Sequence, residues 1–228
     1  MGDSKVLRRE PDGSLVTHAD VSAYVGGLLN DMVVDSVGHA YVGNFGFDLM
    51  GGTAPIETAS LVRIDPGGAV SVAARDLWFP NGSAITPDEK TLLVNETFGN
   101  RVTAFDIGSD GSLLNRRVWA GFGDLPDREV AVAVGQLAVM PDGASLDAEG
   151  ALWVADSRGG RVLRVQEGGE ILEEIPMGSG VFACMLGGAD GRTLFCCVAP
   201  DFHAEKRKAA KEASIVAVRV DVPCATAQ

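Results

Sequence analysis

The sequence predicts an all-β fold of the β-propeller class, formed as a single domain over residues 1–228. Two observations predict it: a four-strand pattern recurs along most of the chain, and each copy has the same kind of tight turn between its first two strands. The copies start at Asn30, Asn81, Asp142 and Ala183, spaced 51, 61 and 41 residues apart. A β-sandwich is disfavoured, because its strands are not expected to restart with the same turn chemistry at every fourth strand.

The first element is a hairpin over residues 6–21. Pro11, Asp12 and Gly13 form its turn, since proline presets the backbone angle and glycine accepts a left-handed conformation. No strand pair comes before it in this sequence, so it corresponds to the outer half of a blade.

Each repeated unit opens with a polar or small residue, followed by a short apolar strand, a turn and a second apolar strand. The turns lie at residues 35–38, 86–89, 147–150 and 188–191; each contains Asp, and three of the four contain Gly. The second strands carry Tyr41, Leu93, Trp153 and Phe195. A β-branched hairpin completes the unit, as at residues 61–72 and 161–172.

The last unit has its inner strand pair and one more strand at residues 214–222, which brings the expected total to about seventeen strands. Residues 204–212 are the one run with helical propensity and predict a loop or a short helix. Two arrangements remain open. The chain forms an incomplete ring of about four to five blades, or a smaller ring closed by pairing the first hairpin with the last blade.

Composition excludes several classes of protein. With 46% hydrophobic and 22% charged residues, the chain can bury a core and is not disordered. A net charge of -12 argues against binding to nucleic acid or to anionic membranes. No apolar run approaches the length of a membrane span and residues 1–10 do not form a signal peptide, so we expect a cytoplasmic protein without a membrane partner.

The cysteines and histidines offer little chemistry. The four cysteines form no CxxC pair, which predicts reduced packing residues, and Cys196 and Cys197 should point to opposite faces of a strand. His18, His39 and His203 lie far apart, and no G-x-S-x-G motif is present, so a Ser/His/Asp hydrolase is disfavoured.

The openings of the first three units carry a resemblance to a known family. The segments Leu29–Asp31, Phe79–Gly82 and Met140–Gly143, each leading into its turn and then an apolar strand, resemble the gluconolactonases, regucalcin (senescence marker protein) and related lactone hydrolases. The resemblance extends from about residue 6 to residue 222. It implies a six-bladed propeller with a divalent cation in its central channel.

The resemblance also implies roles for four residues. Asn81 matches the family's asparagine metal ligand, and Asp142 matches the aspartate that is both a metal ligand and the proposed catalytic base. Asn30 matches the asparagine that reaches the substrate, and Asp48 lies where some members have a carboxylate that contacts sugar hydroxyls. Oxygen donors of this kind suit a hard cation, so Ca²⁺ is favoured, with Mg²⁺, Mn²⁺ or Zn²⁺ as alternatives. Without the resemblance, Asn30, Asn81 and Asp142 are equally interpretable as turn-closing residues at strand starts.

The sequence departs from the family in three places. The Glu-Gly-Pro-like motif that supplies a glutamate metal ligand is absent, and by this comparison the chain lacks the N-terminal blade and a half. The arginine two residues before the substrate asparagine is Leu28 here, and residues 122–139 are longer and more apolar than usual. With one carboxylate fewer, weak metal binding is expected.

Two functions are therefore weighed. The first is a divalent-metal-dependent hydrolase that opens a sugar or aliphatic lactone to its hydroxy acid, with Asp142 as base. The alternative is a catalytically silent propeller that binds a small ligand or a protein. An incomplete ring also exposes unpaired strand edges, which predicts self-association.

Overall fold

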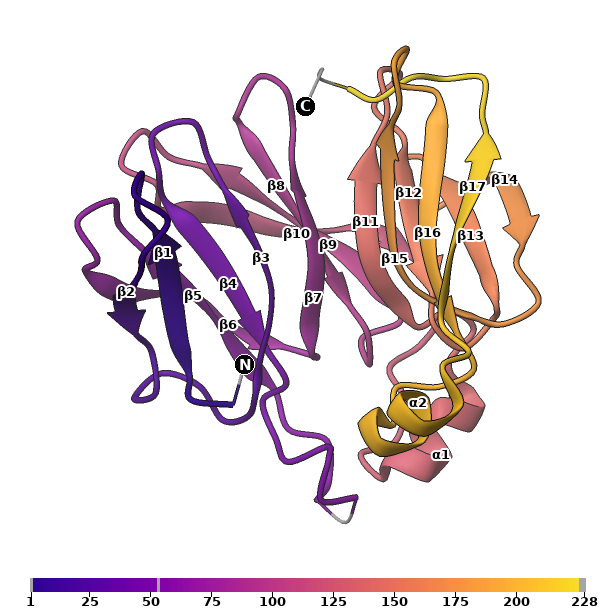
Figure 1. Ribbon diagram of the computed structural model, residues 1–228, viewed down its shortest axis with the longest axis horizontal. Helices are drawn as coiled ribbons and strands as arrows, with labels where there is room; N and C mark the ends of the chain where they lie inside the picture. Colours follow the sequence, from indigo (N-terminus) through magenta and orange to yellow (C-terminus); the bar gives the residue numbers. More distant parts are fainter. Residues whose placement is uncertain (1, 53, 226–228) are drawn as a thin grey trace.

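Seventeen strands and two short helices make up the structure, a computed structural model that describes residues 2–52 and 54–225. The strands form five antiparallel sheets. Three sheets of four strands and one of three strands are successive propeller blades, and a two-stranded hairpin precedes them (Figure 1). The predicted all-β propeller with four to five blades is confirmed.

Strand bounds follow the predicted repeat closely. The hairpin and the first blade contain β1 (Lys5–Arg9), β2 (Leu15–Asp20), β3 (Leu29–Val34), β4 (Ala40–Asn44), β5 (Ala59–Ile64) and β6 (Val70–Leu77). The second blade contains β7 (Pro80–Ile85), β8 (Thr91–Glu96), β9 (Arg101–Ile107) and β10 (Leu113–Gly121). The third and fourth blades contain β11 (Pro141–Leu146), β12 (Leu152–Asp156), β13 (Arg161–Val165), β14 (Ile171–Pro176), β15 (Gly180–Gly187), β16 (Thr193–Ala199) and β17 (Ser214–Arg219).

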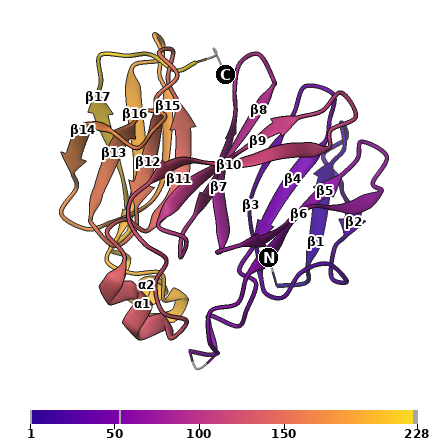
Figure 2. The same ribbon diagram turned by 180° about the vertical axis from the view of Figure 1, so that it is seen from behind.

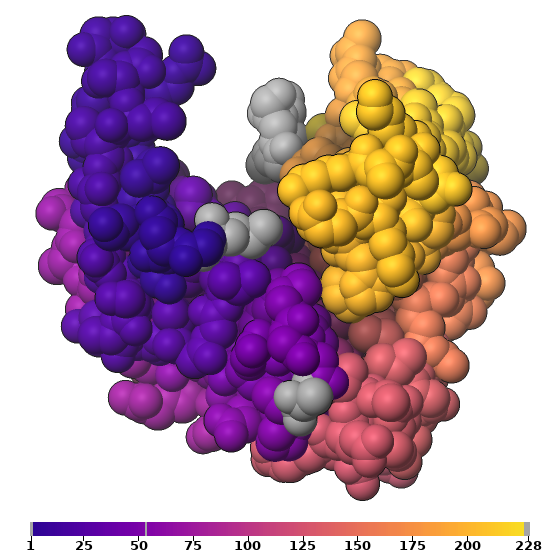
Figure 3. Space-filling model, turned by 60° about the horizontal axis from the view of Figure 1, so that its bottom comes forward, coloured from indigo at the N-terminus to yellow at the C-terminus, as the bar shows by residue number. Residues whose placement is uncertain are grey.

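The first strand of each blade is the innermost one. Strands β3, β7, β11 and β15 lie next to one another around the centre of the molecule (Figure 2). In the part of the chain that the structure describes, the hairpin β1–β2 and the last blade do not pair, and an open space separates them (Figure 3). Of the two predicted arrangements, the chain therefore adopts the open arc.

The tight turns inside the blades are held by aspartates. The Asp147 carboxylate accepts hydrogen bonds from the backbone N–H groups of Glu149 and Ala151 at 2.9 and 3.0 Å. Gly150 closes this turn with a φ of 80°, a left-handed conformation that glycine adopts without steric cost. The short polar turn residues thus stabilise the hairpins locally.

The core lies between blades. Trp119 and Val102 of the second blade pack against Leu152 and Val154 of the third, and similar clusters join the other neighbours. Every residue of β12 is buried, because both faces of the third blade are covered. In β16 of the last blade, burial alternates, with Cys196 buried and Cys197 exposed as predicted. Blade stacking is therefore what buries apolar surface in this fold.

The helices agree only in part with the sequence-based expectation. Helix α2 (Ala204–Ala210) confirms the predicted short helix, but helix α1 (Val130–Gln136) was not expected. Its valines alternate with alanines, a pattern that suggests a strand. The helix forms because Val130, Ala133, Val134 and Leu137 share one face and pack into a single apolar cluster.

No helix among the residues that the structure describes is both long and apolar enough to cross a membrane.

Candidate functional site

Three inner strands carry the same irregularity at the same position. In β3, Leu29 pairs with Asn44 and the next paired residue is Met32, so Asn30 and Asp31 lie in a register shift. The equivalent pairs in β7 and β11 are Asn81–Gly82 and Asp142–Gly143. Such irregularities re-aim side chains and are common beside active sites. They place Asn30, Asn81 and Asp142 at equivalent points around the centre.

Glycines let these strands approach closely. A Cβ atom on Gly82 would lie 2.3 Å from the backbone oxygen of Asp142, and one on Gly143 would lie 2.6 Å from the Cα of Ala183. Real Cβ atoms do not make such contacts. The backbones of β7, β11 and β15 therefore touch, and Asn81 is brought next to Asp142.

Asn81 is 3% exposed and its amide is oriented by neighbours. Its Nδ2 donates to Thr97 Oγ1 at 3.0 Å, and the Thr97 hydroxyl in turn donates to the backbone oxygen of Pro141 at 2.8 Å. The Asn81 Oδ1 is left buried and without a hydrogen-bond partner among the described residues. A buried acceptor without a hydrogen-bond partner lowers the stability of the folded protein. A cation or a hydrogen-bond donor that binds this oxygen would remove that cost.

Asp142 lies in an environment that favours its protonated form. Burial raises the pKa of its carboxyl well above the ordinary 3.8, and the nearby Asp31 carboxylate raises it further. Hydrogen bonds from the Asn81 amide and the Gly143 backbone act in the opposite direction. The Asn95 Nδ2 donates to the Asp142 backbone oxygen at 2.6 Å, which fixes this strand to the preceding blade.

Asn30 is half-buried, and its Nδ2 is shielded from solvent with no hydrogen-bond partner in the described part of the chain. It therefore presents a free donor at the position equivalent to Asn81 and Asp142. The structure brings these three predicted residues to corresponding places on neighbouring strands.

Asp48 lies elsewhere. Its side chain is exposed in a loop, and its Oδ1 accepts from the Gly51 backbone N–H at 2.9 Å. It lines a cavity of about 360 Å³ together with Leu28 and Phe47. This cavity shares no lining residue with the cavity at the inner strands, so the substrate contact of Asp48 stays a prediction.

Sequence reasoning missed Asp31. This residue lines a cavity of about 330 Å³ at the inner strands, together with Gly82 and Gly143. Its side chain is accessible from that cavity, yet the surrounding protein displaces enough water to raise its pKa. The signal in the sequence was an aspartate at the position where the next two units have glycine.

An apolar cluster packs beside the site, at the N-terminal ends of β3, β7 and β11. The residues two places before Asn30, Asn81 and Asp142 all contribute to it, and they are Leu28, Phe79 and Met140. Phe79 stacks on Phe45 with ring centroids 4.4 Å apart. Leu28, which stands where the resemblance predicts an arginine, is therefore a packing residue.

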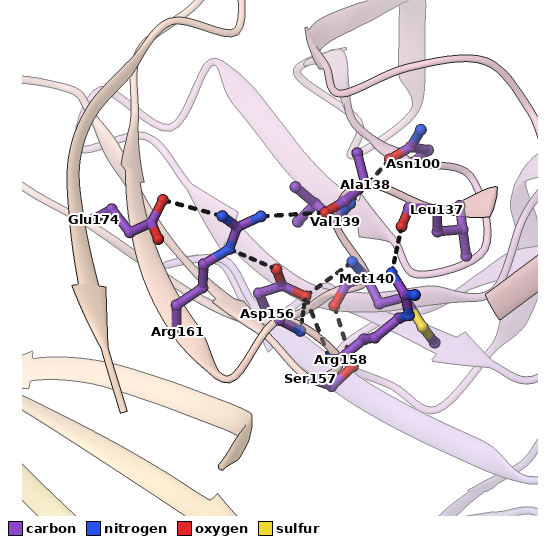
Figure 4. A network of polar contacts seen from close by, with 11 residues as sticks. Asn100, Leu137, Ala138, Val139, Met140, Asp156, Ser157, Arg158, Arg161 and Glu174 are labelled. Carbon is purple, nitrogen blue, oxygen red and sulfur yellow. Dashed lines mark hydrogen bonds and ion pairs between the residues drawn. The ribbon is translucent and has the colours of Figure 1, made fainter. Parts of the chain in front are cut away.

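A polar network fixes the segment that leads into Asp142 (Figure 4). The buried Asp156 carboxylate accepts from the Met140 backbone N–H at 3.1 Å and pairs with Arg161 at 3.0 Å. Arg161 also donates to the Ala138 backbone oxygen, and Arg158 donates to that of Leu137. Residues 137–140 are thus held by side chains from the end of β12, the turn that follows it and the start of β13.

The side chains near Asp142 that could bind a metal ion offer amide and carboxyl oxygens. Among residues 2–52 and 54–225, no group of three or more His, Cys, Asp or Glu side chains is placed to hold a metal ion. The one thiol close by, Cys184, is buried, and this burial raises its pKa well above 9.0. It donates weakly to backbone oxygens of Gly143 and Trp153 instead.

Residues 1–199 match the model of the SMP-30/Gluconolactonase/LRE-like region. The chain is similar to 6-deoxy-6-sulfogluconolactonase of Pseudomonas putida, with 30% identity over 166 residues, which are 72% of this chain and 53% of that protein. The chain spans about half the length of the curated relatives it matches.

Solved structures show the same fold. A regucalcin from Agrobacterium tumefaciens, described as a calcium-binding protein, superposes with a TM-score of 0.75 and 19% identity, covering 97% of this chain and 72% of its own. A gluconolactonase from Xanthomonas campestris has a TM-score of 0.64 and 28% identity, covering 87% of this chain and 63% of its own.

Proposed function

Because the chain belongs to the SMP-30/gluconolactonase/LRE-like family, we propose that it hydrolyses a lactone to its hydroxy acid, using a divalent cation held by Asn81 and Asp142. The observation that supports this most is the buried Asn81 Oδ1, which has no hydrogen-bond partner among the described residues and belongs to an amide that also contacts the Asp142 carboxyl. Lactonase names among the relatives support the substrate class, a sugar or aliphatic lactone.

The residues present fit such a cation. An amide oxygen and a carboxylate are ligands that Ca²⁺ and Mg²⁺ prefer, whereas zinc sites are built mainly from Cys and His. A relative described as a calcium-binding protein supports Ca²⁺. When bound, the cation would supply Lewis-acid polarisation of the lactone carbonyl.

Asp142 provides the proton chemistry. An aspartate carboxylate can accept a proton from water and return it later in the same reaction, which is general base and then general acid catalysis. Its carboxylate oxygen takes a proton from the water that attacks the lactone carbonyl. The same oxygen returns that proton to the ring oxygen as the acyl C–O bond breaks, so the product is the hydroxy acid.

Asn30 orients the substrate. Its Nδ2 has no partner among the described residues and is available to donate to an oxygen of the lactone. A substrate oxygen that accepts this hydrogen bond pairs a donor that is otherwise shielded and unpaired. Substrates with an acceptor at this place should therefore bind more tightly than substrates without one.

Hydrolysis of glucono-1,5-lactone and of a simple aliphatic lactone, followed with a pH indicator in the presence of Ca²⁺, tests the proposal. Wild-type protein should hydrolyse at least one of them, and Asp142→Asn should lower kcat by roughly 10²–10⁴-fold. Asp124→Asn, which removes the same charge from an exposed loop, should leave kcat unchanged. Equal kcat for Asp142→Asn and wild type would refute the role of Asp142.

A further inference from the structure

Thr97 lies directly after β8 and joins the strands that carry Asn81 and Asp142. Its backbone N–H donates to the Phe79 oxygen at 3.0 Å, in the segment that leads into Asn81. Its hydroxyl accepts from Asn81 Nδ2 at 3.0 Å and donates to the Pro141 oxygen at 2.8 Å, one residue before Asp142. Thr97 is 4% exposed, so these contacts are shielded from water.

The direction of these hydrogen bonds fixes the orientation of the Asn81 amide. A carbonyl oxygen only accepts, so the one proton of the Thr97 hydroxyl lies on the bond to Pro141. The hydroxyl oxygen is then left as an acceptor, and it can bond only the Nδ2 end of the Asn81 amide. The Oδ1 end is thereby turned away from Thr97, and this is the atom that is buried without a hydrogen-bond partner among the described residues.

The equivalent residues of the neighbouring blades act within their own blades. Phe45 follows β4 and Ser157 follows β12, at the place where Thr97 follows β8. Their backbone N–H groups donate to the oxygens of Leu28 and Met140, each in the same blade. The Ser157 hydroxyl also donates to Met140, at 3.2 Å, and Phe45 has no hydroxyl. Of these three residues, Thr97 is the one whose hydroxyl bonds the inner strand of the next blade.

The register shift in β11 explains why a donor is needed there. The strand is out of register between Pro141 and Ala144, so the carbonyl groups of Pro141 and Asp142 lie at that irregularity. Buried carbonyl groups at such a place require donors from outside the strand ladder. Thr97 supplies one, and Asn95, two residues earlier on the same face, supplies the other at 2.6 Å. The backbone around Asp142 is therefore held by side chains of the preceding blade.

We propose that Thr97 is a positioning residue, which sets the orientation of the Asn81 amide and the place of this amide relative to the Asp142 carboxyl. The inference rests on the proposed function, in which Asn81 and Asp142 hold the cation. Without the Thr97 hydroxyl, the amide is free to turn over and to present Nδ2, a donor that binds no cation, in place of Oδ1. Thr97 acts through these two side chains and itself contacts neither cation nor substrate.

Hydrogen exchange of the Asn81 side-chain amide, followed by NMR in the metal-free full chain, tests the inference without cation or substrate. Thr97→Val removes the hydroxyl and keeps the shape of the side chain, and it should accelerate this exchange by about tenfold, the worth of one hydrogen bond. Thr97→Ser keeps the hydroxyl and should restore slow exchange.

Thr103→Val is the matched control for this measurement. Thr103 is 1% exposed, and its hydroxyl donates to the Glu96 carboxylate instead of to the candidate site. This variant also loses a buried hydroxyl, yet its Asn81 exchange should stay close to the wild-type rate. Equal exchange rates in Thr97→Val and Thr103→Val would overturn the inference.

Calorimetric titration with Ca²⁺ alone separates this inference from the proposed function. Thr97→Val should weaken Ca²⁺ binding by about tenfold, because only the fraction of protein with Oδ1 correctly turned is competent to bind, whereas Thr97→Ser and Thr103→Val should bind as wild type does. If Thr97→Val binds Ca²⁺ as tightly as wild type, Thr97 does not position the ligands and the proposed function stands. If wild-type protein binds no divalent cation, the proposed metal dependence is refuted, and the exchange rates alone decide whether Thr97 orients Asn81.

Discussion

Gly82 lies against the backbone of Asp142 so closely that a Cβ atom at Gly82 would stand 2.3 Å from the Asp142 oxygen. The inner strands β7 and β11 therefore meet through their backbones. This contact, together with the hydrogen bond from Asn95 to the same oxygen, sets where the Asp142 carboxyl stands relative to Asn81. The position of the proposed base thus depends on a residue with no side chain.

Gly82→Ala should destabilise the protein by about 1–3 kcal/mol, because the added methyl forces the two strands apart. It should also lower lactone turnover by displacing Asp142. Gly67→Ala is the matched control, since a Cβ there meets no atom within 4 Å, and it should change stability by less than about 0.5 kcal/mol. Urea unfolding measures both variants. Equal midpoints for them would contradict the close approach of β7 and β11.

Asp156→Ala should destabilise the protein by about 3–5 kcal/mol, because it leaves Arg161 without its buried partner and frees the Met140 N–H. Glu174→Ala removes the exposed partner of the same arginine and should change stability by less than about 1 kcal/mol. Unfolding by denaturant gives both values. Amide exchange at Met140 should accelerate in Asp156→Ala, and unaltered exchange would show that the network does not hold residues 137–140.

The metal-free protein should become less stable relative to Asp142→Asn as the pH rises. The pKa of Asp142 is raised in the folded protein and ordinary in the unfolded chain. Below pH 3.8 both states are protonated and the carboxyl has no effect on stability. Above it the unfolded chain ionises first, which favours unfolding until the folded carboxyl ionises as well.

Melting temperatures of wild type and Asp142→Asn, recorded in chelator from pH 3 to pH 8, check this dependence. The two curves should coincide at the acidic end and separate toward neutral pH, with the variant higher. A difference of 1 kcal/mol corresponds to roughly 2–4 °C in a chain of this size. Parallel curves over the whole range would mean that the Asp142 carboxyl is not held in a desolvated position.

Asn30→Ala should raise KM for the accepted lactone with little change in kcat, since its free Nδ2 is expected to bind ground state and transition state alike. The loss of one hydrogen bond corresponds to about 1–2 kcal/mol, or roughly 5–30-fold in kcat/KM. Steady-state kinetics measures both constants. An unchanged kcat/KM would place the substrate away from Asn30.

Sequence patterns predicted much of the fold because the information is local. The turn aspartates and glycines, such as Asp147 and Gly150, act within a few residues, so the repeated hairpins could be found from their composition. Helix α1 could not, because its valines favour a strand and only packing of Ala133 and Leu137 into the apolar cluster makes it a helix. Tertiary contacts overrode local propensity there.

Of the candidate site, the sequence predicted the equivalent places of three residues, and their roles stay predictions. Asn30, Asn81 and Asp142 share a position in their units, and the register shifts explain why that position is special. Asp31 was missed because the residues that line a cavity with it, Gly82 and Gly143, are distant in sequence. The role of Asp156 was missed for the same reason, since it is defined by backbone groups of residues 137–140.

We propose that this chain opens a lactone with the help of a divalent cation and Asp142. Hydrolysis of glucono-1,5-lactone and an aliphatic lactone by chelated protein, with Ca²⁺, Mg²⁺, Mn²⁺ or Zn²⁺ added back singly, tests both parts together. We expect no turnover in chelator and restored turnover with Ca²⁺ in wild type but not in Asp142→Asn. Absence of turnover with every metal, from protein whose circular dichroism shows it folded, would refute this function and favour a propeller that binds a ligand without catalysis.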